Sequence, residues 1–350
     1  MYPTFSKTFR LILLFTLVLF KGMAQDTTFR FIKLDFMPKV IWANKIFKSR
    51  VKEAISTSYQ YKHDSLKYTG FAKWKFNEYG QMTDFSWQII DGVNDHGDST
   101  TYRFNDDHLL QEVKWYNDIT DELYRITRYT YNKNNLLKYI HVYDKNEKLW
   151  DSTVFIYVKD TLNPVEVLEY RTHSWMVGNQ SKDSIKLSAR HICRYDARNN
   201  LVNSYECDGQ GKWQVTKKWR YDKNNHCIEE SIDVGSPSKL GWSYDVNQQG
   251  YILRAYEINS GRRDLFKINK YDSSKLVYQN ICRGKMLYSE EEWKFDAMGN
   301  SIFNKIQQST VPARETTASY EYDKNGNFTK RLSSVNNVPE TLQERVIVYY

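Results

Sequence analysis

The stretch Tyr320-Glu321-Tyr322-Asp323-Lys324-Asn325-Gly326-Asn327 decides the fold of this 350-residue chain. Its two rings, two positions apart, lie on one face of an extended strand, and the glutamate between them lies on the other. The aspartate can accept hydrogen bonds from the backbone that follows, and the glycine tolerates the positive φ of a tight hairpin turn. The stretch therefore predicts a strand with one buried and one wet face, followed by a turn.

The same pattern recurs along most of the chain. Successive second rings are 23 to 28 residues apart, except for one gap of 38 residues. A period of this length is typical of repeat proteins, in which each unit buries its apolar face only against its neighbours. The second rings are Phe76, Phe104, Tyr131, Tyr157, Tyr195, Tyr221, Tyr244, Tyr271, Phe295 and Tyr322.

A second apolar run follows each turn, as at residues 83–90 and 136–142. Each repeat is thus two strands and two turns, and neighbouring repeats join as an antiparallel meander. The predicted fold class is all-β: an antiparallel β-hairpin array of about ten repeats that forms a long twisted, curled sheet. We expect residues 51–61 to be the first strand and 345–350 the last, about twenty strands in all.

Outside the array, residues 1–24 read as a signal peptide. Lys7 and Arg10 precede the apolar run from Leu11 to Phe20, and Gly22-Met23-Ala24 has the pattern of a cleavage site. Residues 25–48 are predicted to be an N-terminal cap or leader, and 49–350 the array, with a loop insertion near 172–183 that accounts for the long gap. The predicted location is the periplasm or the cell surface, with no membrane span in the mature chain.

Five Tyr-Asp pairs carry a resemblance to a known family. The phrase at 320–327 and its Phe-Asp and Phe-Asn variants are similar to the YD repeats of the rearrangement-hot-spot (RHS) family, over about residues 60–330. The resemblance implies long β-strips that coil into shells, often around a toxic C-terminal domain, and some relatives are labelled carbohydrate-binding. The Gly-Arg that usually ends the family's turn is absent here. The pairs are Tyr195-Asp196, Tyr221-Asp222, Tyr244-Asp245, Tyr271-Asp272 and Tyr322-Asp323.

Catalytic and metal-binding motifs are absent from the sequence. There is no Gly-x-Ser-x-Gly, no His-Glu-x-x-His, no phosphate loop and no dinucleotide fingerprint, and the seven histidines share no ligand-like spacing. The acidic segment from Asp91 to Asp98 could bind Ca²⁺ or simply form a polar hairpin loop, and it lacks the EF-hand spacing. We therefore predict no enzyme activity, no cofactor and no metal site.

The charged residues bear on two classes of partner, nucleic acids and acidic glycans. Removing the predicted signal lowers the formal net charge from +8 to +5 (47 basic minus 42 acidic residues), which gives no case for nucleic acid. Bases between the paired rings either form a stripe for an acidic glycan or pair with acids on intervening strands. These bases are Lys75, Arg103, Arg194, Arg220, Lys270 and Lys294.

The four cysteines, Cys193, Cys207, Cys227 and Cys282, occupy different phases of the repeat. Equivalent stacked bridges are therefore excluded, while three pairings remain open for an oxidising compartment. Small buried apolar residues, or one incidental bridge, are the simplest interpretation.

The sequence thus predicts a non-catalytic, exported binding or scaffold module whose partner is a polysaccharide or another cell-envelope protein. Two alternatives stay open: a shell-like or immunity partner of a secreted toxin, and an enzyme with a site assembled across repeats. For a glycan binder the candidate rings are Trp175 and Trp213, because the paired rings are expected to face the core. Trp175 falls in the predicted insertion, and Trp213 follows a turn expected to present it at a sheet edge.

Overall fold

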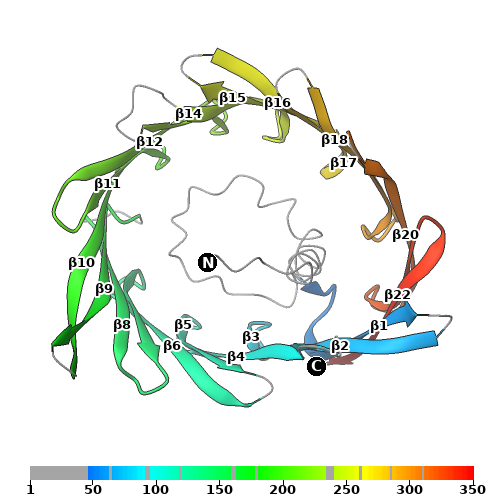
Figure 1. The fold of residues 1–350 in the computed structure, drawn as a ribbon, viewed down its shortest axis with the longest axis horizontal. Coiled ribbons are helices and arrows are strands. Elements are labelled where there is room, and N and C mark those ends of the chain that lie inside the picture. Colours follow the sequence, from blue (N-terminus) through cyan, green and yellow to red (C-terminus); the bar gives the residue numbers. More distant parts are fainter. Residues whose placement is uncertain are drawn as a thin grey trace.

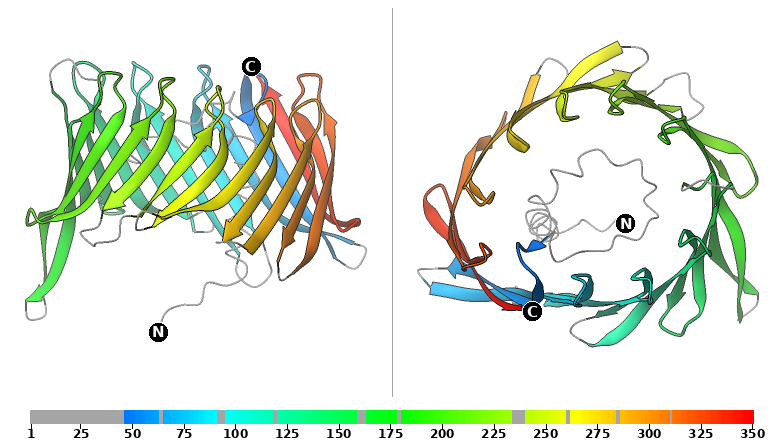
Figure 2. Two further views of the ribbon diagram at one scale, coloured as in Figure 1. Left: turned by 90° about the horizontal axis from the view of Figure 1, so that it is seen from above. Right: turned by 180° about the vertical axis from the view of Figure 1, so that it is seen from behind.

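The chain closes into a β-barrel (Figure 1). The computed structural model describes residues 46–62, 65–90, 95–117, 120–158, 163–177, 180–233, 240–259, 262–283, 286–309 and 311–350. These residues form 22 strands that follow one another as an antiparallel meander, and the first strand pairs with the last. Figure 2 shows the tilted strands from the side and the closed ring from behind. The predicted signal peptide and nearly all of the predicted N-terminal cap lie outside the described residues.

The strands cover nearly all of the described chain and are joined mostly by short turns. They are β1 (Val51–Lys62), β2 (Ser65–Phe76), β3 (Met82–Ile89), β4 (His96–Phe104), β5 (Leu110–Asn117), β6 (Glu122–Tyr131), β7 (Leu137–Asp144), β8 (Leu149–Ile156), β9 (Glu166–Val177), β10 (Gln180–Tyr195), β11 (Leu201–Asp208), β12 (Trp213–Tyr221), β13 (Cys227–Asp233), β14 (Leu240–Val246), β15 (Ile252–Asn259), β16 (Arg262–Asp272), β17 (Lys275–Arg283), β18 (Met286–Phe295), β19 (Ser301–Gln308), β20 (Val311–Tyr322), β21 (Phe328–Val335) and β22 (Val338–Tyr349).

The all-β class and the antiparallel hairpin repeat are confirmed, but the prediction of a long curled sheet is wrong in one respect. The strip does not end in two free edges, because β1 and β22 pair over most of their length. The seam copies the register of the repeats: Val51 lies opposite Tyr349, and one residue is then skipped before Glu53 pairs with Val348. The skip is a β-bulge of the kind that sharpens strand twist and helps a sheet curve into a barrel.

An ordinary repeat has the same bulge in the same place. Tyr322 on β20 lies opposite Phe328 on β21, and one residue is skipped before Glu321 pairs with Lys330. Tyr349 therefore occupies the position that the second ring occupies in each of the other repeats. β1 pairs with β22 as the strand after the turn pairs with the strand before it in an ordinary repeat. The first and last strands are thus two halves of one repeat, joined by pairing instead of by a covalent turn.

Residues just before β1 reinforce the seam. The backbone N–H of Tyr350 donates to the carbonyl of Arg50 at 3.3 Å, and the Tyr350 hydroxyl donates to the carbonyl of Phe76. The ring of Phe47 packs edge-on against Trp74 and Phe76 with centroids 6.1 and 6.0 Å away. An apolar cluster on the inside of the wall therefore covers the place where the two chain ends meet.

The short turns share one hydrogen-bond pattern. In the last of them the side chain of Asp323 accepts from the N–H groups of Asn325 (2.9 Å) and Asn327 (3.0 Å), while Gly326 has a φ of +78°. This confirms the predicted turn chemistry, and the short turns project to the inside of the wall (Figure 1). The leading residues that accept from the backbone four positions on are Asn77, Asn105, Asn132, Asp144, Asp196, Asp208, Asp222, Asn247, Asp296 and Asp323.

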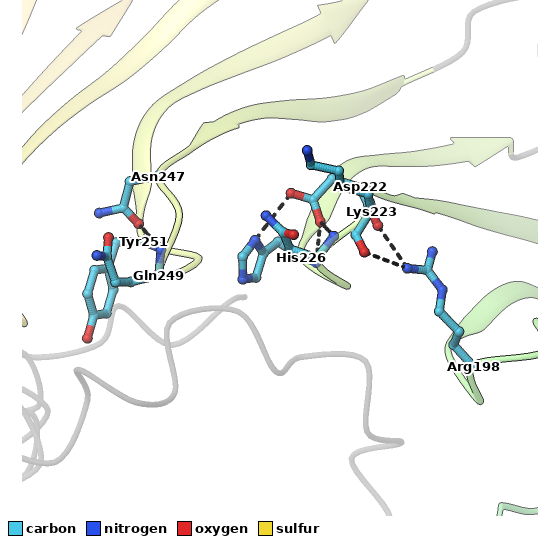
Figure 3. Close-up of polar contacts among 8 residues, drawn as sticks. Arg198, Asp222, Lys223, His226, Asn247, Gln249 and Tyr251 are labelled. Carbon is cyan, nitrogen blue, oxygen red and sulfur yellow. Dashed lines mark hydrogen bonds and ion pairs between the residues drawn. The ribbon is translucent and has the colours of Figure 1, made fainter.

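Neighbouring turns also contact one another. Figure 3 shows the guanidinium of Arg198 reaching the next turn, where it donates to the carbonyls of Asp222 (3.2 Å) and Lys223 (3.1 Å). A Cβ built on Gly250, one turn further on, would lie 2.6 Å from the ring of His226. The turns therefore form a packed row along one rim of the barrel.

The predicted loop insertion near 172–183 is a longer hairpin instead. β9 and β10 pair from the register of Glu166 with Ile192 down to that of Val177 with Gln180. The extra residues extend two adjacent strands, so their backbone groups stay hydrogen-bonded, which a loop of that length would not provide. Alternation of polar and apolar residues on both sides of this segment was a signal for strands.

A disulfide tests the closure. Ile55 and Val346 are register partners across the seam, on the side opposite to the rings. We expect Ile55→Cys combined with Val346→Cys, in a background with the four native cysteines replaced by serine, to form an intramolecular bond on mild oxidation. Non-reducing gels and peptide mapping detect it. A control pair, Ile55→Cys with Ile302→Cys, should stay reduced, and an open strip would leave both pairs unbridged.

A second prediction concerns the turn at Gly326. Valine there takes a strained φ, and a Cβ would lie only 2.5 Å from the Met298 side chain, so Gly326→Val should cost about 1–3 kcal/mol of unfolding free energy. Lys324→Val, at an exposed position of the same turn, should be nearly neutral. Chemical denaturation of both variants measures the difference, and equal losses would contradict the turn assignment.

Candidate functional site: the inner wall

The inner face of the barrel carries the rings of every repeat, two in most repeats and one in those of Tyr195 and Tyr271. Strand alternation and register put them all on one side of the sheet, where Phe47 also packs. We call this ring of side chains the aromatic belt. Its members are Trp74, Phe76, Tyr102, Phe104, Tyr129, Tyr131, Phe155, Tyr157, Tyr195, Trp219, Tyr221, Trp242, Tyr244, Tyr271, Trp293, Phe295, Tyr320, Tyr322 and Tyr349.

The belt borders a lumen. An eight-stranded barrel is just filled by its own inward side chains, and larger barrels enclose a cavity or channel. With strands about 4.8 Å apart and tilted, a wall of this size is about 40 Å across. Only part of the belt is fully buried, as at Phe76 (4% exposed) and Tyr244 (5%). The other side chains of the belt are only partly buried, and their exposed surface lies on the inner face of the wall, toward the lumen.

Tyrosine is used at the second ring for its hydroxyl group. In four repeats this hydroxyl donates to a carbonyl near the start of the repeat before it: Tyr131 to Leu110 (2.8 Å), Tyr157 to Leu137 (2.8 Å), Tyr195 to Pro164 (3.0 Å) and Tyr221 to Leu201 (3.1 Å). In the last repeats the hydroxyls of Tyr322 and Tyr349 instead donate to the carboxylates of Asp296 and Asp323.

These bonds tie six of the repeats to the ones before them, and they also remove the hydroxyl groups from water. Burial raises the pKa of Tyr131 and of Tyr157 to about 12, and that of Tyr102 also to about 12. A phenol whose folded pKa lies above its unfolded value stabilises the fold fully below that unfolded value, and the stabilisation is lost as pH rises toward the folded pKa.

The barrel should therefore lose stability between about pH 10 and pH 12, as unfolded tyrosines ionise while belt tyrosines stay protonated. Thermal midpoints measured across that range, together with absorbance at the phenolate band, test this. Tyr157→Phe should make the decline shallower, since one coupled group is gone. Tyr288→Phe removes the hydroxyl of a ring that is 51% exposed and outside the aromatic belt, and it serves as the matched control. A midpoint independent of pH over this range would contradict the role of the belt.

Two tryptophans and two charged residues form a second inner-wall feature, on β3 to β6. Trp87 is the register partner of Asp98, and Trp115 is that of Arg125. The guanidinium carbon of Arg125 lies 5.0 Å from the centre of the Trp115 ring, and burial raises the pKa of Asp98. We call Trp87, Asp98, Trp115 and Arg125 the tryptophan patch. It combines flat apolar rings with hydrogen-bonding groups, the usual composition of a ligand site.

Other ionisable groups of the inner wall are spread round the ring. On β10, Nε2 of His191 lies 3.0 Å from Oε1 of Glu169, and Nδ1 lies 3.8 Å from Oε2 of Glu206. On β16, burial lowers the pKa of Lys267, an effect opposed by Glu291 on β18. On β13, burial raises the pKa of Glu230. The described residues hold no group of histidines, cysteines or carboxylates arranged to bind a metal ion.

The structure places the bases that stand between the paired rings, which the sequence left either as a stripe or as partners of acids. The six bases between the paired rings point outward, and they do not form an unpaired stripe. Three are register partners of acids on the next strand and three lie over a ring on it. The acid partners are Asp84 for Lys75, Glu112 for Arg103 and Glu229 for Arg220; the rings are Tyr205 for Arg194, Tyr278 for Lys270 and Phe303 for Lys294.

The predicted ligand rings lie on strands. Trp175 belongs to β9 and is paired with Lys182, and Trp213 is the first residue of β12 and is paired with Cys207. The loop predicted around Trp175 is therefore wrong, and closure leaves no free sheet edge beside Trp213. Whether either ring binds a glycan stays a prediction.

The remaining sequence expectations have simple outcomes. All four cysteines are free thiols, and Cys193 and Cys207 are buried. The acidic segment from Asp91 lies partly outside the described residues, and its last member, Asp98, belongs to the tryptophan patch. Within the described part of the chain, no helix has the length and apolar character needed to cross a membrane.

Sequence reasoning missed two inner-wall arginines, Arg331 and Arg345. On each strand the residues directly before and after the arginine point outward. Strand alternation alone therefore places both arginines on the inner face, with the rings. They were passed over because arginine on a strand is usually a surface residue.

Comparisons with known proteins place the chain among very remote neighbours. No protein-family model matches it, and no curated protein matches its sequence. The chain aligns with the Photorhabdus luminescens Tc holotoxin pore carrying a TccC3 mutation (10% identity, TM-score 0.29, 89% of this chain and 19% of that one) and with a TcdB2–TccC3–Cdc42 complex (11%, 0.29, 87% and 18%). It also aligns with a porin-like protein from Bacteroides uniformis (11%, 0.27, 85% and 96%). Likenesses this weak carry no argument about function, and the aligned region spans about a fifth of the two toxin chains.

Proposed function

We propose that this protein is a non-catalytic, exported binding module of the periplasm or cell surface, which holds a polysaccharide inside its barrel. The observation that carries the proposal is the division of the wall into two faces. The rings of the aromatic belt lie on the inner face. The six bases that stand between the rings in the sequence lie on the outer face, where each is paired with an acid or stacked on a ring. A concentrated aromatic surface that borders a cavity is the ordinary signature of a binding site.

The tryptophan patch is the part of the wall best suited to a sugar. Trp87 and Trp115 are half-buried, so each keeps part of its ring facing the lumen side. A ring of this size presents a flat apolar face, and Asp98 and Arg125 beside it supply an acceptor and a donor fork for hydroxyl groups. Such a surface binds without any chemical step.

The layout of the ionisable groups supports binding over catalysis. A reaction needs a nucleophile, a base and an orienting group within hydrogen-bond reach of one substrate atom. Here His191 sits between two glutamates on β9 and β11, whereas the tryptophan patch lies on β3 to β6. The charged groups therefore surround the lumen in separate places and do not converge on one centre.

A glycan array with matched tryptophan variants tests the proposal. The parent protein should bind at least one class of polysaccharide, and Trp115→Ala should weaken that binding by about fivefold or more, the equivalent of about 1 kcal/mol from one lost ring contact. Trp150→Ala removes a ring of the same size on β8, outside the tryptophan patch, where it is 55% exposed, and should leave binding unchanged.

Two further variants separate this proposal from the sequence-based one. Trp175→Ala and Trp213→Ala should have little effect if the patch is the site. Binding that depends on Trp150, or on Trp175 and Trp213 but not on Trp115, would overturn the assignment to the tryptophan patch. A parent protein that binds no glycan would overturn the polysaccharide assignment.

A further inference from the structure

Two arginines lie next to each other on the inner wall beside the seam. Arg331 on β21 is the register partner of Gln343 on β22, and Arg345 follows two residues later on the same face. The guanidinium carbon of Arg345 lies 3.6 Å from the centre of the Phe328 ring. It also lies 5.7 Å from that of Phe47, and Arg345 is only 8% exposed. A full positive charge is thus held among aromatic rings.

No acid neutralises this charge among the residues that the structure describes. Arg345 makes no ion pair and no hydrogen bond there, and its Nε is buried without a partner. The Nε of Arg331 and the hydroxyl of Ser56, the register partner of Arg345 on β1, are also buried without hydrogen-bond partners. Three polar groups of one corner of the wall are therefore unsatisfied together.

Among the described residues, the acids on the neighbouring strand positions face the outer wall, and the acid of the adjacent turn is already bound. Glu344 and Glu321 alternate with the inward residues of their strands and so belong to the outer wall, where Glu321 pairs with Lys330 at 3.8 Å. Asp323 accepts the hydroxyl of Tyr349. Burial, together with the charge of Arg331, lowers the pKa of Arg345 to about 9.

Contact with rings does not offset this cost. A desolvated cation–π contact stabilises a cation by less than the effective penalty for taking an unpaired ion out of water. A bound anion would supply the missing charge and the missing hydrogen-bond acceptors at once. Guanidinium groups match the geometry of carboxylate, phosphate and sulfate oxygens.

We propose that Arg331 and Arg345, with the hydroxyl of Ser56, form an oxyanion-binding site on the inner wall at the seam, which takes one carboxylate, phosphate or sulfate group. The group is either a free inorganic ion or an acidic substituent of the ligand in the lumen. In the second case the site rests on the proposed function and narrows it to an acidic polysaccharide.

Thermal unfolding of the mature full-length protein in phosphate tests the site itself. At ionic strength fixed with sodium chloride, millimolar phosphate should raise the midpoint of the parent protein, because a ligand of the folded state stabilises it. Arg345→Leu should abolish this rise, and without phosphate it should melt no lower than the parent, since a buried unpaired charge is removed. Arg345→Lys should keep part of the rise.

Arg220→Leu is the matched control, because it removes a guanidinium that is paired with Glu229 at 2.6 Å on the outer wall. It should keep the full response to phosphate. If Arg345→Leu does not fold, Arg331→Leu, at a half-buried position, takes its place. No phosphate response in the parent, or an equal response in the parent and in the inner-wall variants, would overturn the site.

The source of the anion is separated by titration with oligogalacturonate and with its uncharged methyl ester. If the anion is an acidic substituent of the ligand, oligogalacturonate should bind at least about tenfold more tightly than its methyl ester, a difference of about 1.4 kcal/mol. Arg345→Leu should remove this preference. A phosphate response without such a preference assigns the site to the free ion. Equal binding of both sugars with no phosphate response overturns the anion site and leaves the proposed function standing.

Discussion

The pairing of β1 with β22 is the contact on which the rest of the molecule depends. A strip of antiparallel strands has two edges with unpaired backbone groups, and such edges recruit other chains. Closure removes both edges at once. It also creates an inside and an outside, which gives different meanings to the two faces of every strand. Without the seam the aromatic belt would be one side of a ribbon open to solvent, instead of the lining of a lumen.

The two faces are stabilised by different physics. On the inside, the aromatic belt removes apolar area from water, and tyrosine hydroxyls tie six of the repeats to the ones before them. On the outside, the six bases between the rings face acids or rings on the next strand, contacts that are individually worth little in water. Each repeat contacts mainly its neighbours, so stability accumulates along the chain as in other repeat proteins. Closure couples the ends of this row.

Much of the fold could be predicted from local sequence, because period, strand alternation and turn chemistry are written in adjacent residues. Asp323 and Gly326 behave in the structure as their residue types require. Closure is a property of the two chain ends taken together, yet a signal was present: Tyr349 follows Tyr322 by 27 residues, which is the repeat period. The final strand is therefore in phase with the repeats. No turn joins it to a partner, and β1 pairs with it as the following strand does in the other repeats.

The site was harder to predict than the fold. Trp175 was chosen because the long gap suggested a loop, whereas hydrogen bonding favours extending the hairpin that is already there. The tryptophan patch joins β3 to β6, and its members belong to different repeats, so no single motif contains it. Arg345 shows the limit most clearly. Its sequence neighbours Glu344 and Val346 suggest an ordinary exposed strand, and only closure and the packing of Phe47 and Phe328 turn it into a buried charge.

That buried charge also bears on how the barrel is held shut. β22 contributes Arg345 and Ile347 to the inner wall within the strand that makes the seam, so a buried unpaired charge lies beside the junction of β1 and β22, which has no covalent turn. A barrel of many repeats can bear such a local cost because the other strand pairs are linked in sequence and hold β1 and β22 near each other, which keeps the entropic cost of pairing them low. The junction is then the place where a bound anion would add most to closure, since it would draw together groups from β1, β21 and β22. An anion bound at the proposed site would in this way link binding in the lumen to closure of the wall through the same few side chains.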